Sequence, residues 1–303
     1  MYDLLILGGG PAGMTAAVYA ARKHLRTLLL SSDLGGQMNW TLGIENYMGY
    51  QFIGGVELMQ KFKTQVEQFS IEIQTGETLA SLSRIEGGFE VSTDSGKKFQ
   101  GKTTIIATGK RPRLLNVPGE EKLIGRGVSY CAVCDGPFFK GLKVAVIGGG
   151  NSALGAVQDL IKIAAHVYLI AHKSLTCDQV LVHKVKDAPN LTTLLGHDTL
   201  AINGNDLVTG ITVKDNKTGE QKDLSVDGVF VEVGLIPNSG FAAALATLSE
   251  HGEIQVNCAC ETGVPGLYAA GDVTNIPEKQ IVVAAGEGAK AALQAHRYLQ
   301  RLA

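Results

Sequence analysis

The pattern of apolar positions predicts two similar units built from buried strands and Ala-rich helices. Residues 2–7 (YDLLIL) predict a short buried strand, residues 14–24 predict a helix, and residues 26–30 (RTLLL) predict the next strand. The same order recurs between residues 143 and 170. Strands that alternate with helices are typical of parallel sheets covered by helices, so the expected fold class is α/β.

Polar, alternating segments follow each unit and predict a small antiparallel sheet in both. The first lies at about residues 71–109 and the second at 207–234. From about residue 252 the chain returns to strand and helix. Residues 266–272 (GLYAAGD) predict a short apolar strand, and an Ala-rich helix begins near Gln280.

Two stretches containing Pro and Gly predict where the chain passes between domains. Residues 112–125 hold two prolines and two glycines, and residues 233–240 (VGLIPNSG) return the chain. We therefore expect one domain inserted into the other. The discontinuous domain comprises residues 1–113 and 241–303, and the inserted domain comprises residues 114–240.

Composition and charge narrow the classes of function. The chain has 303 residues, a formal net charge of −2, 45 % hydrophobic and 18 % charged residues, which is typical of a globular protein. Nucleic-acid-binding domains are usually markedly basic. No apolar run approaches the roughly 18 residues of a membrane helix, and the run at residues 4–7 is too short for a secretion signal. We expect a cytoplasmic protein without nucleic-acid or membrane partners.

Two glycine-rich turns each stand between a predicted strand and a predicted helix. In the pattern G-x-G-x-x-G the first glycine allows a tight turn, the second admits a pyrophosphate and the third lets helix and strand pack closely. The helix N-terminus then offers free N–H groups to the phosphates. The residues at these positions are Gly8, Gly10 and Gly13, and Gly148, Gly150 and Ala153. Two complete strand–turn–helix–strand units favour two Rossmann-like, three-layer dinucleotide-binding domains over two purely structural turns.

One cysteine motif is a candidate for redox or metal-binding chemistry. Cys131 and Cys134 form a C-x-x-C pair, and Asp135 follows directly. A zinc site would need two more ligands at matching spacing, which the other cysteines do not supply, so a redox dithiol is favoured and no metal is expected. Packing or passive thiols are expected for the other three: Cys177, Cys258 and Cys260.

Five motifs together resemble the low-molecular-weight thioredoxin reductase family. They are GGGPAG at 8–13, ATG at 107–109, SYCAVCDG at 129–136, VAVIGGGNSA at 144–153 and GLYAAGDV at 266–273. The chain is also similar to the core of the flavoprotein subunit of alkyl hydroperoxide reductase. That subunit has an N-terminal thioredoxin-like extension, which we expect to be absent because the first glycine-rich turn starts at residue 8.

The resemblance implies FAD in the first domain. Residues 279–281 would begin a helix whose positive end faces the flavin. Asp272 would contact the ribityl chain or the pyrophosphate, the alternative being a helix N-cap. Asp33, or Ser32 in another register, would hold the adenosine ribose. The residues expected at FAD are Gly8, Gly10, Pro11, Ala12, Gly13, Asp33, Gly36, Gln37, Asn46, Ala107, Thr108, Gly109, Gly271, Asp272, Lys279, Gln280 and Ile281.

The resemblance also implies roles for the C-x-x-C-D motif. Cys134 would lie next to the flavin and accept electrons, and Cys131 would attack the disulfide of a thioredoxin-like protein. Asp135 would be the acid that gives a proton to the leaving thiolate, the alternative being a turn residue in Asp-Gly. The family is homodimeric, so a homodimer is expected.

The second nucleotide site departs from the family's pattern. NADPH-using relatives carry a basic HRR-x-x-x-R motif after the second strand, whereas this chain has Ala171–Thr176 (AHKSLT), with neither an arginine nor an acid at the strand end. The donor therefore stays open between NADPH and NADH. The residues expected at this nucleotide are Gly148, Gly150, Asn151, Ser152, Ala153, His172 and Lys173.

Three alternatives to a thioredoxin reductase stay open. The chain could reduce a carrier of a peroxiredoxin system, or it could be a ferredoxin-dependent relative with a vestigial nucleotide site. It could also be a flavin-containing redox sensor that does not turn over. Ferredoxin–NADP reductases on the same scaffold lack the dithiol, so Cys131 and Cys134 argue against that activity.

Overall fold

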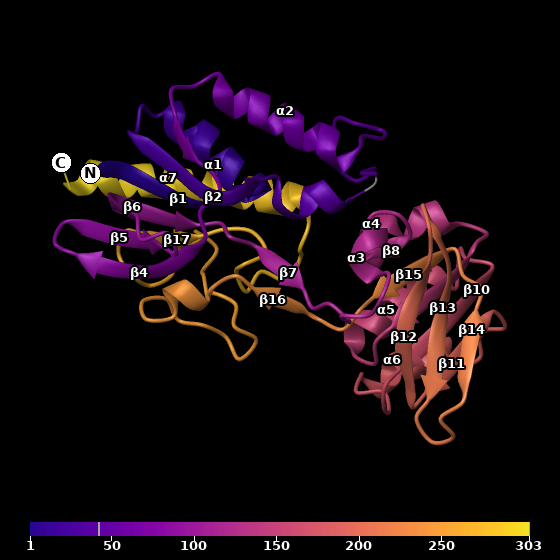
Figure 1. Ribbon diagram of the computed structural model, residues 1–303. Coiled ribbons are helices and arrows are strands. Elements are labelled where there is room, and N and C mark those ends of the chain that lie inside the picture. Colours follow the sequence, from indigo (N-terminus) through magenta and orange to yellow (C-terminus); the bar gives the residue numbers. More distant parts are fainter. Residues whose placement is uncertain (42, 303) are drawn as a thin grey trace. The chain divides into compact units, whose positions relative to one another are not determined.

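The computed structural model describes residues 1–41 and 43–302, and the chain forms two compact units (Figure 1). The first unit comprises Met1–Asn39, Tyr47–Arg111 and Ile236–Ala303, and the second comprises Trp40–Asn46 and Pro112–Leu235. The units therefore change at residues 111–112 and 235–236, whereas the boundaries predicted from the sequence lie after residues 113 and 240.

The first unit is built on a seven-stranded sheet with the order β3-β2-β1-β6-β5-β4, in which β17 also pairs with β6. The strands β1, β2, β3, β6 and β17 are joined by parallel pairings, and β4, β5 and β6 are antiparallel. Their bounds are β1 (Tyr2–Gly9), β2 (Thr27–Leu34), β3 (Glu72–Gln74), β4 (Leu79–Ile85), β5 (Gly88–Thr93), β6 (Lys98–Ile106) and β17 (Leu267–Ala269).

Three longer helices accompany this sheet: α1 (Pro11–Ala21), α2 (Gly55–Glu67) and α7 (Ile281–Leu302). The apolar run of β1 is buried on both faces, as expected for a strand in the middle of a parallel sheet. Helix α7 packs closely on α1, because a Cβ at Gly288 would lie 2.0 Å from the carbonyl oxygen of Ala12. These contacts fix the start of α1, which follows the first glycine-rich turn.

The second unit has a parallel five-stranded sheet with the order β11-β10-β9-β15-β8 and a separate antiparallel sheet β12-β13-β14. The strands are β8 (Val128–Ser129), β9 (Lys143–Ile147), β10 (His166–Ala171), β11 (Leu191–Leu195), β12 (His197–Gly204), β13 (Val208–Asp215), β14 (Gln221–Leu224) and β15 (Gly228–Val231). The helices are α3 (Glu120–Leu123), α4 (Ala132–Asp135), α5 (Asn151–Leu160) and α6 (Gln179–Val185). Parallel sheets with helices confirm the expected α/β fold class.

Short elements complete the chain. The strands β7 (Lys110–Pro112) and β16 (Leu235–Pro237) pair with each other where the chain passes between the units. The 3₁₀ helices are η1 (Gly36–Trp40), η2 (Gly136–Phe139) and η3 (Gly240–Ala242). Among the described residues, no helix is long and apolar enough to cross a membrane.

The polar, alternating segment predicted at 207–234 is divided between two sheets. Its first part forms β13 and β14, whereas its last part, β15 (GVFV), is fully buried and joins the parallel sheet. A strand buried on both faces is apolar throughout, so its sequence does not alternate. Near residue 252 the structure has isolated bridges at Ile254 instead of a strand.

Candidate active site

The first glycine-rich turn joins β1 to α1 and has the geometry of a phosphate cradle. A Cβ at Gly8 would lie 2.3 Å from the carbonyl oxygen of Ala107, and a Cβ at Gly13 would lie 1.8 Å from that of Gly8. A Cβ at Gly10 would meet nothing within 4 Å. Backbone atoms thus fill the space beside the first and third glycines of the turn, whereas the space beside the second glycine is open. This open space lies next to the free N–H groups at the start of α1. This arrangement fits the pyrophosphate of FAD.

The second glycine-rich turn, between β9 and α5, repeats this geometry. A Cβ at Gly148 would lie 2.3 Å from the carbonyl oxygen of Glu232, whereas a Cβ at Gly150 would meet nothing within 4 Å. Ala153 occupies the third position and is fully buried. The residues of this turn fit the pyrophosphate of a second dinucleotide.

Alanine at Gly10 is expected to weaken FAD binding without unfolding the protein. The backbone angles at Gly10 (φ −77°, ψ −172°) suit alanine, and the added methyl group would enter only the open space. We expect FAD affinity to fall at least about tenfold, which corresponds to roughly 1.4 kcal/mol. The flavin-to-protein ratio after desalting measures it, with the unfolding temperature as the check on folding.

The matched control is Gly150→Ala, where the angles (φ −89°, ψ −175°) are similar. This variant should keep its FAD and lose affinity for the nicotinamide nucleotide. Full FAD content in Gly10→Ala would contradict the prediction that the open space at Gly10 receives the pyrophosphate of FAD.

The acid expected at the FAD ribose lies at the end of β2. The Asp33 Oδ1 atom accepts a hydrogen bond of 3.0 Å from the Gly36 N–H, and the hydroxyl of Ser32 donates to Asp33 Oδ2 at 3.1 Å. Both side chains are exposed. Asp33 thus holds the turn into η1, and its contact with ribose stays a prediction.

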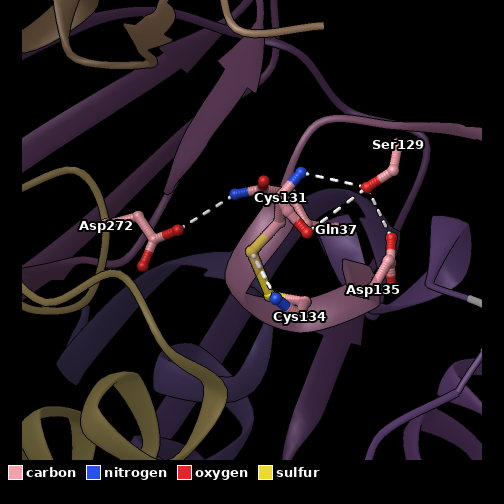
Figure 2. Close-up of a disulfide and its surroundings, with 6 residues drawn as sticks. All are labelled: Gln37, Ser129, Cys131, Cys134, Asp135 and Asp272. Carbon is pink, nitrogen blue, oxygen red and sulfur yellow. Dashed lines mark hydrogen bonds between the residues drawn. A yellow bond between two sulfur atoms is a disulfide. The ribbon is translucent and has the colours of Figure 1, made fainter. Parts of the chain in front are cut away.

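Gln37 and Asp272 are brought together although they are far apart in the sequence (Figure 2). The Gln37 Nε2 atom donates to Asp272 Oδ2 at 3.0 Å. Burial raises the pKa of the Asp272 carboxyl, while Lys279, Gln37 and Lys110 lower it. Because α7 begins at Ile281, Asp272 is not the N-cap of that helix.

A cluster of two lysines and one glutamate stands just ahead of α7. The Lys279 Nζ atom donates to the carbonyl oxygen of Thr274 at 2.6 Å and lies 3.3 Å from Glu253 Oε1. The Lys110 Nζ atom lies 2.5 Å from the same oxygen. Burial and the neighbouring Lys110 lower the pKa of Lys279. Lys279 is predicted from the sequence, whereas Lys110 and Glu253 are not, since neither lies in a motif.

The other residues expected at FAD lie in several segments. Thr108 and Asn238 exchange hydrogen bonds of 2.6 and 2.9 Å, which hold the segment after β6. The Gly271 N–H donates to the buried carboxylate oxygen of Glu287 at 2.8 Å. Asn46 groups with the second unit, and its contact with FAD stays a prediction.

Cys131 and Cys134 form a disulfide across the short helix α4, with their Cα atoms 5.3 Å apart. Cys131 is the N-cap of α4, and the N–H of Cys134 donates to the Cys131 sulfur at 3.2 Å. A helix N-terminus and an N–H donor both stabilise a thiolate on this sulfur when the disulfide opens.

Asp135, the last residue of α4, is held by Ser129 (Figure 2). The Ser129 hydroxyl donates to Asp135 Oδ2 at 2.6 Å and accepts a hydrogen bond of 3.1 Å from the Cys131 N–H. The other oxygen, Oδ1, is buried without a hydrogen-bond partner among the described residues. Burial raises the pKa of the Asp135 carboxyl, and the hydrogen bond from Ser129 lowers it less. The environment therefore keeps the proton on this carboxyl to a higher pH than on an exposed aspartate, a property that a plain turn residue would not need.

Ser129 is a functional candidate that the sequence analysis missed, because one serine before the motif carries no spacing signal. Ser129→Ala is expected to raise the pKa of Asp135 further, since the removed hydrogen bond lowers it. The alkaline limb of the pH profile for disulfide reduction should then move to higher pH. Single-turnover rates over the whole pH range in which the protein stays folded test this, and Ser129→Thr, which keeps the hydroxyl, is the control. An unchanged limb in Ser129→Ala would show that Ser129 does not act on Asp135.

The segment after β10, which the sequence predicts to bind the nicotinamide nucleotide, carries two exposed basic side chains, His172 and Lys173. The His172 Nδ1 atom contacts Asp198, whose carboxylate also accepts a hydrogen bond of 3.2 Å from Asn216. At the start of α5, Asn151 exchanges hydrogen bonds with Asp178. Basic and acidic side chains thus lie together at this segment. Charge alone therefore favours neither the 2′-phosphate of NADPH nor the 2′-hydroxyl of NADH.

The other cysteines do not join the redox motif. All three are free; Cys177 and Cys260 are buried and Cys258 is exposed. Burial raises the pKa of the Cys260 thiol to about 11, so it is a poor nucleophile. Among the described residues, no group of three or more His, Cys, Asp or Glu side chains could hold a metal ion.

Comparison with known proteins gives the family. The model of the family "Pyridine nucleotide-disulphide oxidoreductase" matches residues 2–288, and the chain belongs to this family, whose members use FAD and a pyridine nucleotide. Within it, the chain has the fold of the thioredoxin reductases. It superposes on the thioredoxin reductase of Streptococcus pyogenes with a TM-score of 0.94 and 38 % identity, covering 99 % of both chains. The enzyme from Giardia duodenalis gives 0.91 and 32 %, again over 99 % of both.

Curated relatives show a second likeness. The chain is 46 % identical to the F subunit of alkyl hydroperoxide reductase in Pseudomonas putida, over 99 % of this chain and 58 % of the relative. For the Staphylococcus aureus protein of the same name the identity is 43 %, over 99 % of this chain and 59 % of the relative. The chain therefore spans less than two thirds of the length of these relatives. The resemblance to thioredoxin reductases and the resemblance to the flavoprotein subunit of alkyl hydroperoxide reductase, both expected from the motifs, are confirmed.

Proposed function

We propose that the protein is an FAD-dependent disulfide reductase that passes electrons from a nicotinamide nucleotide to Cys131–Cys134 and on to a thioredoxin-like protein. The observation that carries the proposal is the disulfide on α4 with the buried, partly unpaired carboxyl of Asp135 beside it. The two cradles with an open second glycine support two dinucleotides. When bound, FAD supplies a two-electron carrier between nucleotide and disulfide.

The chain's own residues prepare the thiol exchange. Opening the disulfide consumes two electrons and one proton and leaves one thiol and one thiolate. The N–H of Cys134 stabilises negative charge on the Cys131 sulfur, which then attacks the partner's disulfide and forms a mixed disulfide. The Asp135 carboxyl gives its proton to the first leaving thiolate of the partner and takes up the proton of the Cys134 thiol. The Cys134 thiolate then opens the mixed disulfide and releases the second sulfur of the partner as a thiolate.

The donor is NADPH or NADH, and the partner is a thioredoxin-like protein. Sustained turnover with each nucleotide and with thioredoxin tests both. A second candidate function is the reduction of a peroxiredoxin-system carrier, which the 46 % identity to the alkyl hydroperoxide reductase of Pseudomonas putida favours. Activity with such a carrier but not with thioredoxin would select it. Reduction only by a ferredoxin-like donor would indicate a vestigial nucleotide site, and no turnover with any donor would favour a redox sensor.

The quaternary state and the location follow from the resemblance. We propose a homodimer, and light scattering of the purified protein measures its mass. The cytoplasmic location stays a prediction.

A further inference from the structure

Two lysines share one glutamate in the first unit, in a cluster that the thiol exchange does not use. The Lys110 Nζ atom lies 2.5 Å and the Lys279 Nζ atom 3.3 Å from the same oxygen, Glu253 Oε1. The side chains of Lys110, Lys279 and Glu253 expose only 9 %, 17 % and 16 % of their surface. We call these three residues the lysine cluster. Because two cations face one carboxylate, one positive charge of the cluster has no counter-ion within it.

Lys110 comes from the edge of the sheet that carries the first glycine-rich turn. It follows the end of β6, and Ala107, which lies between, carries the carbonyl oxygen that is next to Gly8. The strands β1 and β6 pair in parallel, so both segments leave the sheet at its carboxyl edge. Open α/β sheets bind their ligands at this edge. Lys110 therefore stands on the side of the first unit on which FAD is proposed to bind.

Lys279 comes from the same edge by way of β17, which also pairs with β6 in parallel. After this strand, a Cβ at Gly271 would lie 3.1 Å from the Cβ of Ala12 and 3.3 Å from that of Ala284. These alanines belong to the first turns of α1 and α7, so the two helix N-termini meet here. The Thr274 hydroxyl donates to the Gly271 carbonyl oxygen at 2.8 Å, and the Thr274 carbonyl oxygen accepts the hydrogen bond from Lys279. Lys279 is thereby tied to the point where α1 and α7 begin.

Burial makes the acids around the lysine cluster ionise less readily. It raises the pKa of the carboxyl of Asp272, which directly follows Gly271. It also raises the pKa of Glu287, which accepts the hydrogen bond from the Gly271 N–H. The two helix N-termini add partial positive charge. The surroundings of the cluster therefore favour positive charge at this edge of the sheet.

We propose that Lys110 raises the reduction potential of the bound flavin, as the cation that Glu253 and Lys279 leave uncompensated. The inference rests on the proposed function, since it requires FAD in the first unit. Two electrons and one proton added to an oxidised flavin leave one negative charge on the ring, and a nearby cation stabilises this charge. At an effective dielectric constant of about 20, unit charges still interact across about 10 Å, so Lys110 needs no contact with the ring.

The potential isolates this effect from binding of the rest of FAD. The pyrophosphate keeps its charge when the flavin is reduced, so its attraction to Lys110 is equal in both states and cancels. A raised flavin potential gives the step from the nicotinamide nucleotide to the flavin a larger driving force. It gives the step from the flavin to the Cys131–Cys134 disulfide a smaller one.

The test measures the flavin potential of the FAD-loaded protein without oxygen. Xanthine, which xanthine oxidase oxidises to urate, supplies electrons through a mediator to the flavin and to a reference dye. The absorbance of both gives the ratio of reduced to oxidised flavin at a fixed dye ratio. In Lys110→Met this flavin ratio should fall at least about threefold, because one cation is lost. Lys110→Gln, which removes the same charge with a polar side chain, should show a similar fall.

Three further variants separate charge from packing. Lys110→Arg keeps the cation and should keep the wild-type ratio. The double variant Lys110→Met and Glu253→Gln loses one cation and one carboxylate, leaves Lys279 as the single charge, and should return the ratio toward the wild type. Lys102→Met is the matched control, because Lys102 pairs with Asp3 at 2.9 Å near the start of β1, at the opposite edge of the sheet. The ratio should not change there.

The outcomes separate the two proposals. Flavin content and unfolding temperature verify that each variant is folded and loaded. A wild-type ratio in FAD-loaded Lys110→Met and Lys110→Gln overturns the inference and leaves the proposed function standing. A double variant that stays as low as Lys110→Met also overturns it, since loss of packing and not of charge would then lower the ratio. A wild type that holds no FAD after incubation with it overturns the proposed function, and the inference with it.

Discussion

Replacing either cysteine of the redox motif with Ser is expected to abolish disulfide reduction, with turnover more than about 1000-fold below the wild type. The physical reason is that the two electrons enter by opening the bond between Cys131 and Cys134, and a single thiol offers no such bond. Turnover with a nucleotide and a thioredoxin-like disulfide measures it. FAD content and reduction of the flavin by the nucleotide should persist, because both depend on the cradles and not on the dithiol.

The two cysteine variants should differ in what they trap. With Cys131 as the attacking thiol, Cys134→Ser should accumulate a mixed disulfide with the partner, since the resolving thiol is missing. Cys131→Ser should accumulate much less. Non-reducing electrophoresis and mass spectrometry detect the adduct, and the reverse pattern would show that the roles are exchanged. Cys258→Ser, at an exposed free cysteine, is the control and should turn over normally.

Asp135→Asn has the second largest expected effect, a loss of about 100- to 10,000-fold in the rate of disulfide reduction. Asn keeps the size of the side chain and an oxygen for the hydrogen bond from Ser129, but it has no proton to give. In the wild type the active form carries the proton, so the rate should fall as pH rises through the raised pKa of Asp135. This alkaline limb should be absent in Asp135→Asn; its persistence there would assign the proton to another group.

The same substitution is expected to stabilise the protein. Because the folded pKa of Asp135 is raised above the unfolded value, the native state holds more protons between the two pKa values, and stability falls as pH rises through that interval. Below the unfolded pKa the wild type and Asp135→Asn should therefore be equally stable. Near neutral pH the variant should unfold at a higher temperature, and an equal or lower unfolding temperature there would contradict the burial of this carboxyl.

The parts of the site that sequence could predict are local. Each glycine-rich turn is specified by residues within one strand–turn–helix unit, and the open space at Gly10 and Gly150 is the geometry that the pattern predicts. The C-x-x-C pair is equally local, since its residues share one turn of helix α4. Such features do not depend on how distant segments pack.

The residues that sequence did not find depend on tertiary contacts. Ser129 reaches Asp135 because β8 ends beside α4, and the carbonyl oxygen of Glu232 lies against Gly148 because β15 pairs with β9. Lys110 and Lys279 share Glu253 although long stretches of chain separate them. No spacing rule in a single sequence reports these contacts. The buried strand β15 was joined to the preceding polar segment for the same reason, because burial on both faces is a property of the sheet.

Anaerobic reduction of the FAD-loaded protein by NADPH and NADH separately, with dithionite as the chemical control, tests whether a nucleotide delivers electrons through the flavin to the dithiol. The visible flavin absorbance reports electron entry, and alkylation followed by mass spectrometry reports the dithiol. We expect rapid bleaching by one of the nucleotides and new alkylation at Cys131 and Cys134. Bleaching by dithionite alone would contradict it, and would mean that the second cradle does not deliver electrons to the flavin.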